Sequence, residues 1–402
     1  MSDTLIIYEK NNAVISAGFD EHTLVSFKID ELENVYKPGN IFVGHVSKIL
    51  LHLKAAYVDI GMNHDCYMEM EEDFDYLTVD SHPDGELHVG DELVVQIKKE
   101  AGKGKPATVS PCIEIAGKLV LAGYSGKISK NPVKPSFSSK IKDPDFKKDM
   151  EKLFSEKLKP KRSLLIRTGA YGAGSEEILS DFERCFATLE NILETGCSRT
   201  KGSLLWESPP NYLIQIRDHK GFDCDKLITD SPEIYVRLKD YLSEYQPDLL
   251  PVLSFYSDRV LPLENLYDMK KNIKEICSEK IWLKSGASIV IQQTEALSIV
   301  DVNSSKASGD RKNFKEGFLK LNLEAAGEIC RQLILRNLSG IIVVDFINDR
   351  NTSQAVFLSE LEKIFSVDKT IQVVDITKLG LVEITRKRES KPVAELIRKY
   401  ML

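Results

Sequence analysis

Two aspartates stand at the ends of apolar, β-type segments in the last third of the chain. Asp301 ends Leu-Ser-Ile-Val-Asp, and Asp345 ends Gly-Ile-Ile-Val-Val-Asp. An unpaired carboxylate is costly in an apolar setting, so such a group normally has a charged partner or a metal ion. Asn303 lies two positions after Asp301, so on a strand both side chains point to the same face.

Two carboxylates and one amide oxygen form a hard, all-oxygen ligand set. This set suits Mg²⁺, with Mn²⁺ as an alternative ion and water in the remaining positions. No His or Cys stands nearby in the sequence, so zinc is not expected. A bound ion of this kind activates water and stabilises a phosphoryl transition state, which predicts hydrolysis of phosphodiesters. The competing interpretation is that each aspartate only caps a turn at a strand end.

The composition describes an ordinary globular protein with several modules. A chain of 402 residues exceeds one typical core, and its hydrophobic content of 42% is average. No signal peptide is visible, and no stretch approaches the roughly 18 apolar residues that a membrane span requires. The seven cysteines are scattered and never form Cys-x-x-Cys, which favours a reducing, cytoplasmic location.

The charge is unevenly distributed along the chain. The net charge of −7 disfavours a simple nucleic-acid binder. Residues 97–163, however, contain 16 Lys and one Arg against seven carboxylates, so this stretch carries +10 and the remainder −17. Such a stretch is either an electrostatic footprint for phosphates or a solvated face.

The first half of the chain predicts mainly strands. Three short strands within residues 4–29 are too few for a domain and must pair with a later segment. Five further strands with glycine turns predict a small OB-type barrel. We expect these five at residues 41–49, 55–60, 66–68, 92–97 and 108–115.

The middle of the chain contains one candidate anion site. A strand at 163–168 and a helix at 175–194 flank the glycine-rich turn 169–174. Such a turn can cradle an anion, although a tight turn without a ligand is the alternative. It lacks the Gly-Lys-Ser/Thr of a nucleotide P-loop, so ATP binding is not expected.

The second half predicts alternating helices and strands. The part spanning residues 211–280 is expected to complete the sheet begun by the N-terminal strands, around an inserted β module. A long amphipathic helix at 313–337 should separate the strands of Asp301 and Asp345. Residues 386–388 form a basic cluster. The predicted elements are strands at 212–217, 252–256, 288–293, 296–302, 341–346, 370–375 and 381–385, and helices at 147–158, 231–243, 263–277 and 354–364.

Residues 286–388 contain three distinctive motifs, Thr-Glu-Ala-Leu-Ser-Ile-Val-Asp-Val-Asn-Ser, Asn-Leu-Glu-Ala-Ala-Gly-Glu-Ile-Cys-Arg-Gln-Leu and Gly-Leu-Val-Glu-Ile-Thr-Arg-Lys-Arg. With these motifs the chain resembles the bacterial ribonuclease E/G family, and the resemblance is strongest in this segment but covers essentially the whole length. Ala-Ala-Tyr-Val-Asp-Ile-Gly further upstream is similar to an S1 RNA-binding domain, and Leu-Leu-Ile-Arg-Thr supports the match in the middle of the chain.

The resemblance implies an α/β multidomain fold. An S1 (OB-type) barrel at 36–118 would be inserted in a split RNase H-like α/β subdomain formed by 1–35 plus 211–280. A 5′-sensor region would follow at 119–210, and a DNase I-like α/β catalytic subdomain at 281–402.

The resemblance also implies a function. The chain would be a Mg²⁺-dependent endoribonuclease that cuts single-stranded RNA to 5′-phosphate and 3′-hydroxyl ends, in rRNA or tRNA processing or in mRNA decay. Asp301 and Asp345 would bind the ion, and Asn303 would orient the attacked phosphate or the water. The alternative is a non-catalytic RNA-binding scaffold that retains the fold.

Further site residues follow from the same resemblance. The S1 positions that would hold RNA are Tyr57, Tyr67 and Lys105. A preference for 5′-monophosphorylated RNA would depend on a phosphate pocket. The pocket positions are Gly117, Val120, Arg167 and Thr168.

The sequence departs from the family pattern near its end. The family usually continues into a Cys-x-x-Cys zinc link and a small domain, and neither is present up to Leu402. A zinc-linked dimer is therefore not expected, and the oligomeric state is left open. Asn348-Asp349 stands where an acid commonly takes the first of the two positions, and Thr370 stands near a usual basic position, next to Lys369.

Overall fold

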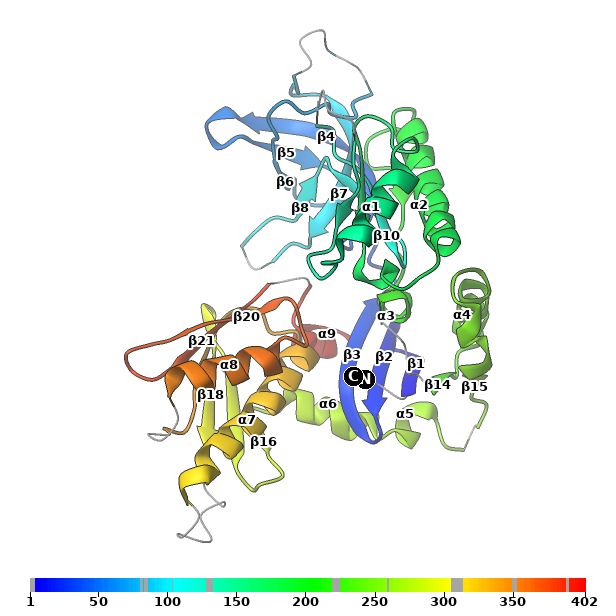
Figure 1. Ribbon diagram of the computed structural model, residues 1–402. Helices are drawn as coiled ribbons and strands as arrows, with labels where there is room; N and C mark the ends of the chain where they lie inside the picture. The colour runs from blue at the N-terminus through cyan, green and yellow to red at the C-terminus, as the bar shows by residue number, and fades with distance from the viewer. Residues whose placement is uncertain are drawn as a thin grey trace. The chain divides into compact units, whose positions relative to one another are not determined.

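The computed structural model describes most of the chain. The chain forms two compact units, residues 1–32 with 222–402 and residues 33–221 (Figure 1). The four-part division expected from the sequence stays a prediction. The described residues are 4–79, 82, 86–102, 104–127, 133–218, 225–258, 260–304, 314–348, 353–387 and 390–402. Within them, no helix combines the length and the apolar character needed to cross a bilayer.

The unit 33–221 contains a closed five-stranded barrel. Its strands follow the order β4-β5-β6-β8-β7, and β7 pairs back onto β4. This closure is consistent with the predicted OB-type, S1-like domain. A Cβ at Gly44 would lie 2.3 Å from a methyl group of Val58, so glycine permits the close approach inside the barrel. The strands are β4 (Ile41–Leu50), β5 (Ala55–Asp59), β6 (Cys66–Glu69), β7 (Glu92–Lys99) and β8 (Thr108–Ser110).

A four-stranded sheet with two helices completes this unit. The predicted strand 108–115 is wrong as one element, because it divides at Pro111 into β8 of the barrel and β9 of this sheet. The sheet has the order β11-β12-β10-β9. Its elements are β9 (Ile113–Ala116), β10 (Val120–Tyr124), β11 (Ser136–Phe137), β12 (Arg162–Ile166), α1 (Pro144–Phe154) and α2 (Ser175–Gly196).

The predicted strand 212–217 is wrong. After β13 (Leu204–Trp206), which pairs with β4, residues Asn211–Asp218 form helix α3. Tyr212, Leu213 and Ile216 are buried, and their spacing fits one face of a helix rather than of a strand.

The other unit begins with the N-terminal sheet, of order β15-β14-β1-β2-β3. The first strand, β1, pairs in parallel with β14, which confirms that the N-terminal strands need a later partner. The predicted helix 263–277 is broken at Asp268, whose φ is 49°. The elements are β1 (Thr4–Lys10), β2 (Ala13–Asp20), β3 (Thr23–Glu31), β14 (Lys226–Thr229), β15 (Leu253–Phe255), α4 (Pro232–Tyr245), α5 (Leu263–Leu266) and α6 (Met269–Cys277).

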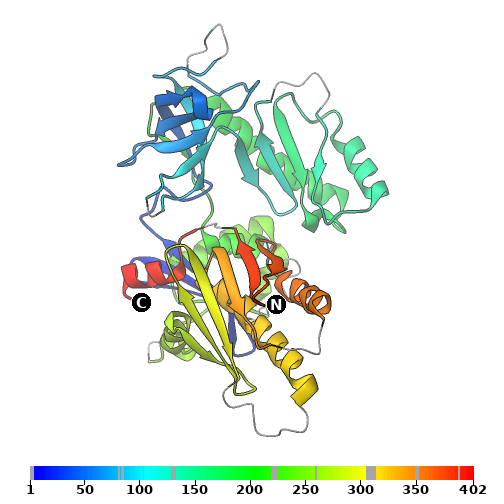
Figure 2. The same ribbon diagram turned by 90° about the vertical axis from the view of Figure 1, so that its left-hand side faces the viewer.

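The same unit contains the C-terminal sheet, of order β16-β17-β18-β19-β21-β20. Helices α7 and α8 pack on one face of this sheet (Figure 2). Helix α7 also contributes Leu335 to the hydrophobic core of the N-terminal sheet. The elements are β16 (Lys280–Trp282), β17 (Ser288–Gln293), β18 (Leu297–Asn303), β19 (Gly340–Asp345), β20 (Ile371–Ile376), β21 (Val382–Arg386), α7 (Phe314–Arg336), α8 (Gln354–Phe365) and α9 (Val393–Tyr400).

Candidate active site

Asp301 and Asp345 lie opposite each other on neighbouring parallel strands. The register of β18 and β19 pairs Asp301 with Asp345, and adjacent strands of a sheet are about 4.8 Å apart. Both carboxylates are exposed, whereas Val300, Val302 and Val344 are buried in the core under α7. The alternation of the strands therefore places both acids on the open face of the sheet.

The surroundings of the two acids fit a divalent cation. Asn303 donates its amide N–H to Asp301 Oδ2 at 2.6 Å, so it orients that carboxylate. Across the described ranges, neither Asp301 nor Asp345 forms an ion pair with Lys or Arg. Two like charges side by side without a counter-charge repel each other. Carboxylate and amide groups are the ligands that Mg²⁺ prefers, and three polar side chains leave positions for water.

Arg386, the first residue of the basic cluster 386–388, is buried and stabilises the fold. Arg386 is only 4% exposed. Its Nε donates to Asp368 at 2.9 Å, and its Nη1 donates to Asn337 at 2.8 Å. Arg386 therefore ties β21 to the end of α7 and cannot reach a substrate. Arg388 lies outside the described residues.

Thr370 and Asp349 lie at positions where the sequence departs from the family pattern. Thr370 donates its hydroxyl to Asp368 at 2.7 Å. Burial raises the pKa of Asp368, but the hydrogen bonds from Thr370 and Arg386 outweigh it and hold the pKa below its usual value. Asp349 lies outside the described residues.

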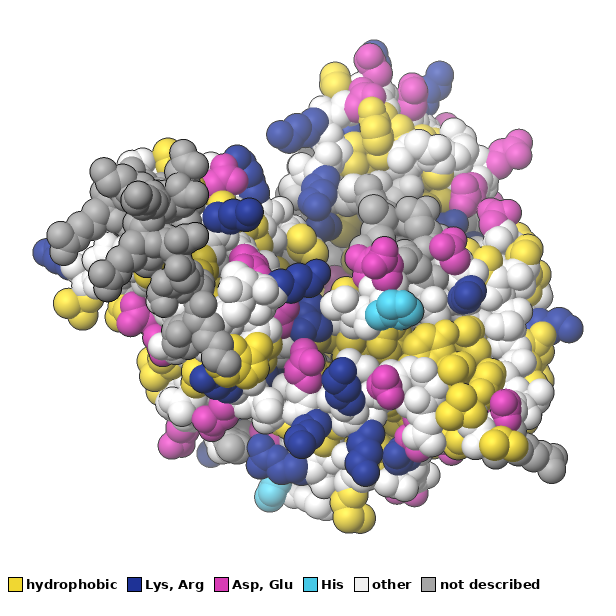
Figure 3. Space-filling model, turned by 90° about the horizontal axis from the view of Figure 1, so that it is seen from below, with side chains coloured by type: hydrophobic (Ala, Val, Ile, Leu, Met, Phe, Trp, Pro, Cys, Tyr) yellow, Lys and Arg dark blue, Asp and Glu magenta, His cyan; other side chains and the backbone are white. Residues whose placement is uncertain are grey.

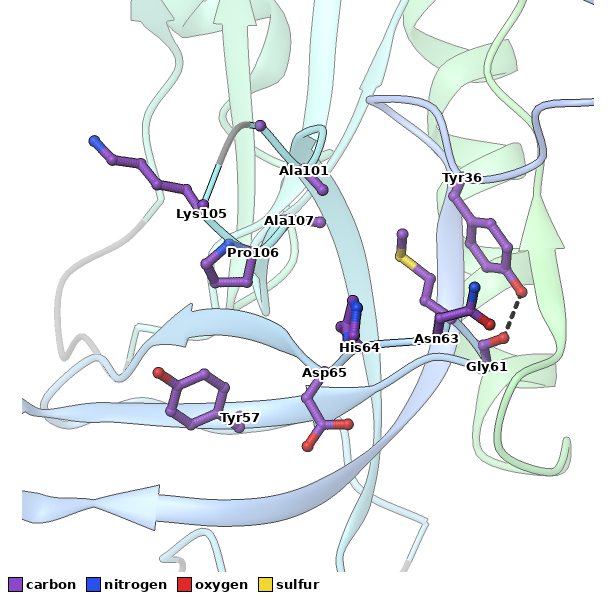
Figure 4. Close-up of a pocket in the computed structure, with 13 residues that line it drawn as sticks. Tyr36, Tyr57, Gly61, Asn63, His64, Asp65, Ala101, Lys105, Pro106 and Ala107 are labelled. Atoms are coloured by element: carbon purple, nitrogen blue, oxygen red, sulfur yellow. Dashed lines mark hydrogen bonds between the residues drawn. The ribbon is translucent and has the colours of Figure 1, made fainter.

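The barrel carries the aromatic residues expected to hold RNA. Tyr57 and Tyr67 are direct partners on β5 and β6, and their rings meet edge to face with centroids 6.2 Å apart. Tyr57 and Lys105 line a groove of about 1030 Å³ (Figure 4). Tyr36, also in this groove, donates its hydroxyl to the carbonyl of Gly61. Rings and an exposed amine beside an open groove suit unpaired bases and their phosphates.

The Lys-rich stretch 97–163 is partly neutralised by ion pairs. Several of its cations contact carboxylates within 3.3 Å, so its local charge of +10 overstates the field that a ligand meets. The paired residues are Lys98, Lys118, Lys134, Lys159, Lys161 and Arg162.

The proposed phosphate-pocket residues lie together at the end of β12. Arg167 donates to the carbonyl of Gly117, and the hydroxyls of Thr168 and Ser138 are 2.7 Å apart. The Arg167 guanidinium also forms an ion pair with Asp218 at 2.8 Å. This arginine therefore already holds an anionic group from its own chain.

Backbone groups near this pocket are bound by Asp181 of α2. Its carboxylate is 2% exposed and accepts N–H bonds from Lys118, Leu119 and Val120 at 2.8–3.3 Å. A Cβ at Gly117 would lie 2.3 Å from Asp181 Oδ2, so only glycine fits there. Gly117 and Val120 therefore shape the loop, and the N–H of Val120 is not free for a ligand.

Sequence reasoning missed Arg217 and Asp218. Arg217 donates to Asp218 at 2.8 Å, so Asp218 lies between two guanidinium groups, those of Arg217 and Arg167. Burial raises the pKa of Asp218, but its bonds to Arg217 and the nearby charge of Arg167 outweigh burial and hold the pKa below its usual value. The incorrect prediction of a strand at 212–217 prevented this pair from being recognised. In the structure both residues lie at the C-terminal end of α3.

Asp181 was also missed, although the sequence contains a signal for it. It lies on the apolar face of α2, among the buried residues Ile178, Phe182 and Cys185. An acid at a buried helical position needs donors, and here the loop before β10 supplies them.

The glycine-rich turn 169–174 is less suited to an anion than its composition suggests. Gly174 caps α2, and Glu176 and Glu177 occupy the first turn. These two carboxylates take the position near the helix N-terminus where the dipole favours a negative charge.

Comparison with known proteins identifies relatives. The model of the Ribonuclease E/G family matches residues 126–389, which include β18 and β19. Ribonuclease G of Escherichia coli (strain K12) is 29% identical over 373 residues, which cover 89% of this chain and 74% of that protein. Ribonuclease E of Haemophilus influenzae is 29% identical over 387 residues, which cover 94% of this chain and 40% of that protein. The chain therefore spans less than half of that ribonuclease E, and the match extends over both the barrel and the C-terminal sheet.

Proposed function

The chain belongs to the ribonuclease E/G family, and on this premise we propose that it is a Mg²⁺-dependent endoribonuclease for single-stranded RNA. The observation that carries the proposal is the register of Asp301 with Asp345 on the open face of the C-terminal sheet. Two carboxylates side by side on a solvated face repel each other and add little to the fold, whereas they fit a divalent ion.

The chain's own residues would each perform a definite task. Asp301 and Asp345 hold the ion, and Asn303 keeps the Asp301 carboxylate in place through its N–H bond. When bound, Mg²⁺ activates a water molecule and stabilises the charge that develops on the phosphate. Hydrolysis of the bond between phosphorus and O3′ would leave a 5′-phosphate on one product and a 3′-hydroxyl on the other.

The barrel supports the choice of single-stranded RNA. Tyr57 and Tyr67 offer rings to unpaired bases, which a duplex would keep stacked inside. Arg167 and Thr168 would recognise a 5′-monophosphate, because a guanidinium makes charge-assisted bonds to phosphate oxygens. This recognition requires Arg167 to exchange Asp218 for the ligand.

The test is cleavage of a labelled single-stranded RNA by the purified chain, with Mg²⁺ and with excess EDTA. We expect cleavage only with Mg²⁺, and a loss of about 1000-fold or more in Asp301→Asn and in Asp345→Asn, with RNA binding retained. Glu362→Gln removes one exposed charge on α8 and should cleave normally. Full activity in either aspartate variant would refute the site. Binding without cleavage by the unmodified chain would instead support the RNA-binding scaffold.

A further inference from the structure

A second groove lies in the unit that contains the two aspartates. It has a volume of about 700 Å³ and is bounded by α6, by β16 with the turn after it, and by the middle of α7. Lys and Arg side chains gather in the middle of the face seen in Figure 3, which views the molecule from below. None of the residues assigned above to catalysis or RNA binding lines this groove.

Four exposed lysines line the groove: Lys271, Lys274, Lys280 and Lys284. In the part of the chain that the structure describes, none of the four forms an ion pair with a carboxylate. Several cations of the stretch 97–163, in contrast, are paired with acids. The groove therefore concentrates positive charge that is available to a ligand.

The acids that line the groove are already occupied. Arg331 binds Glu275 at 2.9 Å and Glu328 at 2.7 Å. Glu324 accepts the backbone N–H of Ser285 at 3.1 Å. The lining therefore carries five cations, the four lysines and Arg331, against three carboxylates, which leaves a net charge of +2.

An exposed aromatic ring stands beside the lysines. Trp282 is 52% exposed at the edge of the C-terminal sheet, and Lys280 Nζ lies 4.3 Å from the centroid of a Trp282 ring. A large exposed ring in a basic groove offers a stacking surface, and stacking on aromatic side chains is the main sequence-tolerant way to bind an unpaired base.

A glycine in the middle of α7 is part of the groove surface. Gly327 lines the groove, and a Cβ built on it would meet no atom within 4 Å. Glycine inside a helix costs about 0.5–1 kcal/mol relative to alanine. Packing therefore does not require glycine at this position, and the surface of α7 there faces the open groove.

We propose that this groove is an additional contact site for single-stranded RNA, in which Trp282 stacks on a base and the lysines bind neighbouring phosphates. The proposal rests on the proposed ribonuclease function, because it assigns the same substrate class to a second surface. Among anionic ligands RNA fits best, since an acidic peptide would use the lysines but would make no use of the exposed Trp282 ring.

Binding is measured with the full chain and fluorescein-labelled oligouridylate in EDTA, so that cleavage does not interfere. Trp282→Ala should weaken binding by about tenfold. Lys274→Gln/Lys284→Gln should lower the slope of log affinity against log salt concentration by about 1.4, because each phosphate that a lysine neutralises adds about 0.7 to this slope. The control Lys239→Gln/Lys320→Gln removes the same charge at exposed positions outside the groove. It should leave both the affinity for oligouridylate and the salt slope nearly unchanged.

Direct stacking is measured by fluorescence. The chain has two tryptophans, so Trp206→Phe leaves Trp282 as the single reporter. Oligouridylate should quench its emission, whereas polyphosphate, which has no bases, should not. Absence of quenching together with unchanged affinity in the groove variants would overturn the proposal. Polyglutamate serves as the probe for an acidic peptide, and groove variants that lose polyglutamate binding but keep their affinity for oligouridylate would also overturn it. If the groove variants still cleave RNA, the proposed ribonuclease function holds whether or not the groove binds RNA. If the unmodified chain neither binds nor cleaves RNA, the proposed ribonuclease function itself is refuted.

Discussion

The acid pair on the C-terminal sheet and the arginine pair at the end of β12 are opposite solutions to the same electrostatic problem. Asp301 and Asp345 are two like charges in register without a counter-charge in the described structure. Arg167 and Arg217 are also two like charges close together, but the carboxylate of Asp218 lies between them. Under the proposed function a divalent cation would balance the first pair, whereas the protein itself supplies the counter-charge of the second.

This contrast predicts different behaviour toward ligands. A ligand of the acid pair relieves repulsion and should bind without displacing any protein group. A phosphate at the arginine pair must displace Asp218, so its apparent affinity is reduced by the stability of the internal ion pairs. Metal binding and phosphate recognition therefore respond in opposite ways to the loss of a nearby carboxylate.

The largest effect is expected when both carboxylates of the acid pair are removed. Because Asp301 and Asp345 would hold one ion, Asp301→Asn/Asp345→Asn should lose about as much activity as either single variant, roughly 1000-fold. Single-turnover cleavage rates of the three variants provide the measurement. Losses that multiply would show that the two acids act independently.

A smaller effect is expected at the arginine pair. Arg167→Ala should reduce the preference for 5′-monophosphorylated over 5′-hydroxylated RNA by about 10- to 100-fold, because charged hydrogen bonds contribute about 1.5–3 kcal/mol. The ratio of kcat/KM for the two RNAs gives the measurement. Arg199→Ala removes an exposed arginine of the same unit and should keep the ratio. An unchanged ratio in Arg167→Ala would exclude the pocket.

Removal of the internal anion should have the opposite sign. Asp218→Asn removes the internal negative charge that competes with a phosphate for Arg167 and Arg217, so affinity for 5′-monophosphorylated RNA should rise by about 3- to 10-fold. Equilibrium binding in EDTA provides the value. A decrease would show that Asp218 organises the arginines for the ligand instead of competing with it.

The stability of the folded protein should depend on pH through Asp218. The pKa of Asp218 is lower in the folded protein, so its charged form stabilises the fold. This contribution is complete well above the unfolded pKa of about 3.9 and disappears as the pH falls through the folded pKa. Urea unfolding should therefore show Asp218→Asn less stable than the unmodified chain by about 1 kcal/mol at pH 7, with a smaller difference near pH 3. A constant difference would contradict this origin.

The smallest effect is expected for the stability of the acid pair. Asp301→Asn removes like-charge repulsion, so without metal it should raise the free energy of unfolding by a few tenths of a kcal/mol. Urea unfolding in EDTA measures it. A clear loss of stability would mean that Asp301 has a structural role, as the turn-cap interpretation holds.

The sequence predicted these two sites to very different degrees. Asp301 and Asp345 lie on strands with regular alternation, so their face and their proximity followed from period two and from the apolar character of both strands. Arg217 and Asp218 could not be placed, because Tyr-Leu-Ile-Gln-Ile-Arg alternates like a strand while its buried residues follow a helix. Tertiary packing decided between the two periods.

The breaks between elements were equally hard to predict. The barrel strand at 108–115 ends at Pro111, and the helix at 263–277 ends where Asp268 takes a left-handed conformation. The four lysines of the groove gave no charge signal, because Glu275 and Glu279 interrupt them along the chain. Only the fold brings Glu275 to Arg331 and leaves the lysines available.

The register of β18 with β19 determines which changes in chain length the site tolerates. Deleting one residue within either strand would turn its aspartate to the core face, since side chains alternate along a strand. Insertions between Asn303 and the start of α7 would leave the strand pairing unchanged, because the register depends on the sheet and not on the connection. In a library of length variants, active members should therefore differ in this connection and be identical in the length of both strands.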